Sequence, residues 1–149
     1  MFPHRIAPEK QVEIFRDLKE QLPQYEFVIC QETQLTKNEY HNMLGEAKLV
    51  FSANLQETLG ISWYEGAIVD AIPMVPDRLS YSEMALSHFL YNSEWTENFE
   101  AYQANRQQIC YTIMQYMNNY EHFLPYVRKQ VDHLTDNFFS ATALLGNLK

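Results

Sequence analysis

The sequence predicts an α/β fold, with a parallel sheet covered by helices on both faces and a C-terminal helical tail. Over the first 95 residues, short apolar runs alternate with segments whose apolar residues recur at helical spacing. This alternation is typical of parallel strands, because each needs a long crossover to the next. From Thr96 onward only the helical spacing remains. The 149 residues suffice for one compact domain. We expect residues 1–95 to form it and residues 96–149 to pack on it.

The first predicted elements are the tail of a strand at residues 1–2 and a helix over residues 9–22. The helix has one apolar face, and Pro23 ends it because proline cannot continue a helix. That face consists of Val12, Phe15, Leu18 and Leu22. Residues 26–30 are apolar enough to form a short buried strand.

A second helix is predicted to begin after Thr36, where Glu39 three residues later completes a capping-box pattern. Residues 48–52 then form the next strand. A third helix begins near residue 60, and a strand over residues 72–75 ends at Pro76. The buried side of the third helix consists of Ile61, Tyr64, Ile68 and Ala71.

The tail is predicted to form two long amphipathic helices. The first is marked by Phe99, Tyr102, Ile109, Ile113, Tyr116 and Met117. The second is marked by Phe123, Val127, Val131 and Leu134. No Gly- or Ser-rich linker precedes them, so we expect one domain with a helical extension.

Charge and composition exclude several classes of protein. The 11 Lys and Arg residues are scattered among 19 acidic residues, and the net charge of −8 argues against a broad nucleic-acid surface. The two cysteines have no metal-like spacing, which favours a reducing cytoplasm. We also expect no metal and no cofactor. No signal-peptide pattern and no bilayer-spanning apolar run occur in the sequence.

Two glutamates around the start of the third helix carry the main functional pattern. Glu57 and Glu65 are eight residues apart, which on a helix is within about 80° and roughly 12 Å along the axis. Two carboxylates so placed can address separate parts of one elongated ligand. Between them, Gly60 and Ile61 occupy the first turn, where unpaired N–H groups and the helix dipole favour phosphate. The pattern indicates a nucleotide-sugar site.

These motifs resemble the donor-binding, C-terminal half of retaining GT-B glycosyltransferases of the family 4 type. The resemblance rests on ETLGISWYEG, on AIPMVPDRLSYSEM and on the opening PHRIAPEK. Within that family the chain resembles the tRNA-queuosine mannosyltransferase group. That group shares the proline-His-Arg opening, a following Lys and a segment like residues 76–83. The likeness covers residues 1–91.

The resemblance implies a single Rossmann-like GT-B half and transfer of a hexosyl group, with retention, from a nucleoside diphosphate sugar. Arg5 and Lys10 would then contact the diphosphate, and neutralising its growing charge would lower the barrier. Glu57 would accept from a sugar hydroxyl and Glu65 from the ribose hydroxyls. In the same way His4, Tyr81 and Glu83 are assigned to the donor side. No metal is required in this scheme.

Each of these residues also has an ordinary interpretation. The two glutamates can be solvated helix positions, the two basic residues surface charges, and His4 a structural hydrogen-bonding group. Tyr81 and Glu83 can simply cap and pack a short helix. The alternative functions are a non-catalytic nucleotide-sugar-binding or interaction subunit, a remnant or fragment without the acceptor domain, and a sugar-nucleotide epimerase of similar fold.

The resemblance also implies a partner. A GT-B enzyme needs two such domains, so we expect these residues to be inactive alone and to require an N-terminal acceptor-binding domain or a second subunit. Apolar residues on the last helices would form the seam with that domain, or with a second copy in a homo-oligomer. The donor base, the sugar and the acceptor remain open. A nucleic-acid acceptor would follow from the tRNA-modifying group, but the acidic balance gives it no support.

Two departures from the family pattern bear on the prediction. The glycine-rich loop that the N-terminal domain contributes is absent. In place of a small residue and glycine before the proline of the last strand, the chain has Asp70-Ala71-Ile72-Pro73, which tightens the expected pocket.

Overall fold

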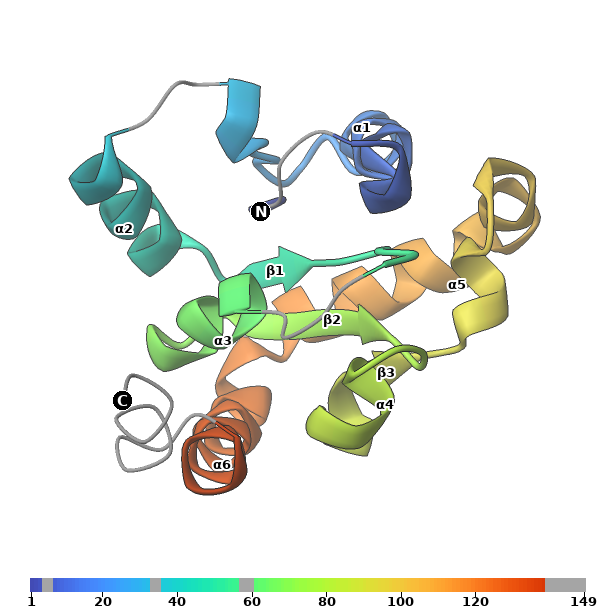
Figure 1. Cartoon of the computed structure of the whole chain (residues 1–149). Helices are drawn as coiled ribbons and strands as arrows, with labels where there is room; N and C mark the ends of the chain where they lie inside the picture. The colour runs from blue at the N-terminus through green and yellow to red at the C-terminus, as the bar shows by residue number, and fades with distance from the viewer. Residues whose placement is uncertain (4–6, 33–35, 57–60, 139–149) are drawn as a thin grey trace.

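The computed structural model describes residues 1–3, 7–32, 36–56 and 61–138 and has an α/β architecture (Figure 1). Its sheet consists of β1 (Leu49–Phe51), β2 (Ile72–Pro76) and β3 (Leu90–Tyr91), in that order. Both pairs of neighbouring strands are parallel. Every residue of β1 and β2 is buried, as is typical of parallel strands that helices cover on both faces.

Residues 1–2 extend the hydrogen-bonded array beyond β1. Met1 O accepts from Phe51 N at 3.0 Å. On the other side, Phe2 N donates to Val28 O at 2.8 Å, and Cys30 N donates to Phe2 O at 3.2 Å. The spatial order is therefore 28–30, 1–2, β1, β2, β3. After residues 1–2 the chain goes to residues 28–30, which lie on one side of them. It then returns to β1 on the other side and continues through β2 to β3. The strand order therefore reverses between residues 1–2 and β1.

Helices cover both faces of this array. They are α1 (Val12–Gln21), α2 (Lys37–Glu46), α3 (Ile61–Ile68), α4 (Tyr81–Met84), α5 (Phe99–Asn118) and α6 (Tyr120–Asn137). Short 3-10 turns are η1 (Pro8–Lys10), η2 (Cys30–Glu32), η3 (Ser87–Phe89) and η4 (Ser93–Thr96). Leu49 and Phe51 pack in one core cluster with α1 and α5, whereas Val50 packs in a second cluster with α2, α3 and α4. The alternation follows from the two-residue period of a strand.

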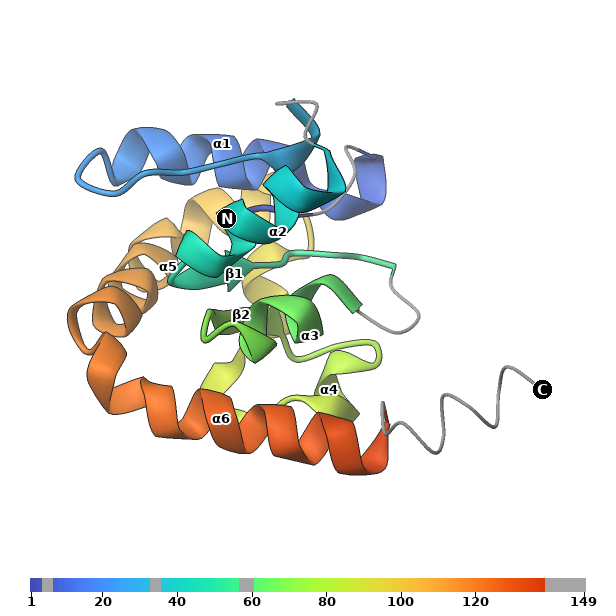
Figure 2. The same ribbon diagram turned by 90° about the vertical axis from the view of Figure 1, so that its left-hand side faces the viewer.

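The two long tail helices share the core of the first 95 residues. Tyr102 of α5 and Val127 of α6 are fully buried in the same cluster as Phe51. In Figures 1 and 2, α1 lies above β1 and α6 lies below β2, beyond the two ends of the strand order. No helix in the described part of the chain is both long and apolar enough to span a bilayer.

Local sequence signals located most of these elements. The Thr36 side chain accepts from Glu39 N at 3.1 Å, so the predicted cap is confirmed. The strand predicted at 26–30 is wrong: only Ile29 forms a bridge, with Phe2, and a 3-10 turn begins at Cys30. The third helix ends at Ile68 rather than continuing to Ala71. β3 was not predicted, because a strand of two residues shows no periodicity.

Candidate functional site

The candidate site lies at the carboxyl ends of residues 1–2 and β1, where the strand order reverses. In open α/β sheets, ligands bind in the crevice at such a point. The described parts of the two loops, 7–11 and 52–56, contact each other there. Leu55 N donates to Glu9 O at 2.7 Å, and Lys10 Nζ donates to Gln56 O at 3.2 Å. Two loops distant in sequence thus form one edge of the sheet.

Gln11, the last residue of loop 7–11, joins that loop to loop 52–56 through hydrogen bonds of its side chain. Its backbone is left-handed, with φ of 52°, and ends η1 so that α1 can begin at Val12. Its buried side-chain nitrogen donates to Ala53 O at 2.8 Å and to Thr96 O at 2.6 Å. A buried amide with both interactions made is costly to replace by an apolar group, because the two carbonyls would lose their partner.

Tyr81, one of the predicted donor-binding residues, is fully buried under the loop after β1. Its hydroxyl lies 2.9 Å from Ser52 Oγ and accepts from Asn54 Nδ2, also at 2.9 Å. Its ring meets Trp63 of α3 edge to face, with centroids 5.9 Å apart. These contacts match the packing interpretation of Tyr81. They also link β1, α3 and α4 beneath the candidate site.

Tyr91, at the end of β3, completes this buried polar layer. Its hydroxyl donates to Ser52 O at 2.7 Å and lies 3.1 Å from Thr96 Oγ1. Burial raises the pKa of Tyr91 well above its ordinary value, so the hydroxyl stays protonated and able to donate.

Glu65 projects from α3 and is partly exposed, with a side-chain exposure of 36%. Its Oε2 lies 3.7 Å from Nε2 of His41 on α2, an ion pair when the imidazole is protonated. Together with burial, which is the larger cause, the Glu65 charge raises the pKa of Tyr40 to about 12. Glu65 therefore carries an accessible carboxylate between α2 and α3.

The remaining predicted site residues divide into two groups. Glu83 is exposed on α4. Lys10, described above, is partly buried. The others, His4, Arg5, Glu57 and Gly60, lie outside the described residues. Ile61 is the first residue of α3, and its side chain is likewise outside the described part.

Sequence reasoning overlooked Gln11, Asn54, Arg78 and Tyr91. Arg78 is the second residue after β2, in the sequence PDRLSYSEM, and its guanidinium contacts the loop after β1. Its signal was available, because a charged residue in a loop directly after a buried strand is a functional hint. The other three carry no comparable signal, because their hydrogen-bond partners lie far away in the sequence.

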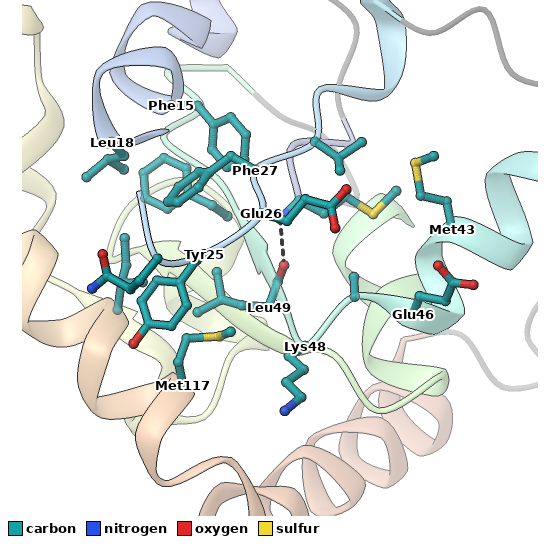
Figure 3. Close-up of a pocket in the computed structure, with 16 residues that line it drawn as sticks. Phe15, Leu18, Tyr25, Glu26, Phe27, Met43, Glu46, Lys48, Leu49 and Met117 are labelled. Carbon is teal, nitrogen blue, oxygen red and sulfur yellow. Dashed lines mark hydrogen bonds between the residues drawn. The ribbon is translucent and has the colours of Figure 1, made fainter. Parts of the chain in front are cut away.

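A cavity of about 370 Å³ opens at the other end of the sheet (Figure 3). Apolar side chains from α1 and α5 line it, and Glu26, Glu46 and Lys48 also contribute. Met1 and Leu49, which line the cavity, lie at the amino ends of their segments. The candidate site lies at the carboxyl ends, so the two are at opposite ends of the strands. None of the predicted site residues that the structure describes lines the cavity.

In the described residues, no cluster of three or more His, Cys, Asp or Glu side chains is arranged to hold a metal ion. No protein-family model matches the chain, and no curated protein matches it significantly. The glycosyltransferase function therefore stays a prediction from the sequence motifs.

Proposed function

We propose that the chain is the donor-binding half of a retaining glycosyltransferase with a Rossmann-like GT-B domain. It would bind a nucleoside diphosphate sugar and act with an acceptor-binding domain. The observation that carries the proposal is the contact of loops 7–11 and 52–56 at the point where the strand order reverses. There the Lys10 ammonium reaches the loop that leads to Glu57 and α3. A cation at the carboxyl ends of parallel strands suits a diphosphate.

Lys10 and Glu65 would hold different parts of this ligand. The Lys10 ammonium would neutralise the charge that builds up on the diphosphate as it leaves, an interaction that strengthens in the transition state. The Glu65 carboxylate, partly exposed on α3, would accept hydrogen bonds from the ribose hydroxyls. When the ligand binds, His41 would either keep its contact with that carboxylate or lose it. Arg5 and Glu57 complete the proposed set.

The experiment is a calorimetric titration of the purified chain with UDP, GDP and ADP and with their glucose and mannose conjugates. Lys10→Met and Glu65→Gln are the test variants, and each should raise the Kd about tenfold or more, since each removes a charge-assisted contact. Lys129→Met and Glu20→Gln, at exposed positions on α6 and α1, are the matched controls and should bind as the unmodified chain does.

Two outcomes would contradict the proposal. One is a folded chain that binds none of these nucleotides. The other is binding that both test variants retain in full, which would place the ligand elsewhere. Saturable binding of one nucleotide that both variants weaken would support the proposal and identify the base.

A further inference from the structure

Arg78 lies in the turn after β2 and donates to four backbone carbonyls from two separate segments. Its Nε donates to Asn54 O at 2.8 Å and one terminal nitrogen donates to Ala53 O at 2.8 Å. The terminal nitrogens also donate to Ser93 O at 2.9 Å and Thr96 O at 3.2 Å. The planar guanidinium thereby joins the loop after β1 to the turn η4, which follows β3.

The guanidinium is partly buried and makes no ion pair with any carboxylate of the described residues. Burial lowers the pKa of Arg78, and the electrostatic influence of Tyr91, Tyr81 and Glu97 opposes that shift. A guanidinium still stays charged at neutral pH. Removing a charge from water is costly unless its donors are used, and here they are used on the loop carbonyls. The Arg78 guanidinium therefore binds the loop carbonyls and not a counter-ion.

Holding these carbonyls also sets the direction of the neighbouring amides. The C=O and N–H groups of one planar trans peptide point in opposite directions. Arg78 holds Asn54 O on the inner side, and Leu55 N, in the same peptide, therefore points outward to Glu9 O at 2.7 Å. Glu9 is followed in loop 7–11 by Lys10.

Gln11 acts on the same acceptors. Its side chain donates to Ala53 O and Thr96 O, which are two of the four carbonyls that Arg78 contacts. The two side chains approach these carbonyls from different elements, the turn after β2 and the start of α1. Loop 52–56 is thereby held between the two loops that flank it.

We propose that Arg78 is a positioning residue for the anion-binding edge of the candidate site. Through the peptide that joins Asn54 and Leu55, it keeps loops 7–11 and 52–56 in register and so places Lys10 beside the ligand. This inference rests on the proposed function for the nature of the ligand. Lysine cannot replace Arg78, because a single ammonium lacks the planar fork that serves separate carbonyls.

The test measures both the loop and the ligand in the full chain. The variants are Arg78→Lys and Arg78→Ala. The matched control is Arg128→Ala, which removes an exposed arginine on α6 that pairs with Asp70 at 3.7 Å. Hydrogen exchange at the Leu55 amide reports the contact with Glu9 directly. Calorimetry with UDP, GDP and ADP reports binding. Both assays are repeated with millimolar guanidinium chloride, well below denaturing concentrations.

Both Arg78 variants should speed exchange at Leu55 about tenfold or more and weaken binding of the preferred nucleotide to a similar degree. Guanidinium should restore protection and affinity in Arg78→Ala in part, which a general loss of stability would not allow. Unchanged exchange at Leu55 would overturn the inference, as would equal acceleration across the whole sheet without rescue.

The two proposals fail separately. If the unmodified chain binds and Arg78→Ala binds as tightly, the positioning role is wrong and the proposed function stands. If the unmodified chain binds no nucleotide, the proposed function is wrong. Exchange at Leu55 then still decides whether Arg78 holds the two loops in register.

Discussion

Two glycines in the chain should respond to alanine in opposite ways. Gly66 lies in α3, where the helix approaches β1. A Cβ at this position would lie 2.7 Å from Cγ2 of Val50 and 3.6 Å from Cβ of Ala71. Gly45 lies in α2, and a Cβ there would meet nothing within 4 Å. Neither glycine has a positive φ. The difference between them is therefore one of space.

The size of the effect at Gly66 follows from that distance. Ordinary contact begins at 3.4 Å, so Val50 would have to retreat by 3.4 − 2.7 = 0.7 Å. Val50 is fully buried in β1, between residues 1–2 and β2, and its branched side chain has few rotamers. Overpacking of this kind costs about 1–3 kcal/mol, and alanine returns about 1 kcal/mol of helix propensity. We expect a net loss of about 1 kcal/mol for Gly66→Ala.

The assay is urea unfolding of both variants, followed by far-UV circular dichroism. Gly45→Ala should raise the free energy of unfolding by up to about 1 kcal/mol, because only the propensity gain remains. The two midpoints should therefore move in opposite directions with equal m-values. A Gly66→Ala variant as stable as the unmodified chain would refute the close approach of α3 to β1.

Three further predictions follow from single residues. Leu79 is exposed with a left-handed φ of 56°, so Leu79→Gly should raise the midpoint of urea unfolding, by up to about 1 kcal/mol in free energy; a lower midpoint would show that the leucine packs. Tyr81→Phe leaves two buried polar partners short of a hydrogen bond and should cost about 1–3 kcal/mol in the same assay, whereas Tyr111→Phe, at an exposed position, should cost nothing measurable. Burial and, to a lesser extent, Glu65 raise the pKa of Tyr40 from 10.0 to about 12, so the folded chain binds that proton more tightly than the unfolded chain does. The resulting stability is complete below pH 10 and lost as the pH rises toward 12, and Tyr40→Phe should flatten the decline in unfolding free energy over that range.

Local sequence signals predicted the elements whose hydrogen bonds are local. The cap at Thr36 depends on a group three residues away, and the two tail helices repeat their apolar residues over many turns. Pairing between segments was harder to predict. Residues 26–30 have strand-like composition, yet only Ile29 forms a bridge. A full strand also needs a neighbouring segment long enough to pair with it. Residues 1–2 offer a short one.

The candidate site shows the same division. The motif residues Lys10 and Glu65 were found from the sequence. The structure describes Lys10 against loop 52–56 and Glu65 beside His41 of α2, and their roles in binding stay predictions. Tyr81 was assigned to the donor side, and the structure places its hydroxyl in the buried layer below. A sequence motif identifies a residue but not the direction of its side chain, which packing sets.

By itself, the sequence determined the α/β alternation, the helical tail and the acidic balance, because periodicity and charge are properties of neighbouring residues. Only the tertiary structure decided which loops meet and what holds them. Arg78 contacts carbonyls that are 15 to 25 residues away in the chain. Every residue carries a carbonyl, so no side-chain pattern can mark those acceptors. Folding alone brings them to one guanidinium.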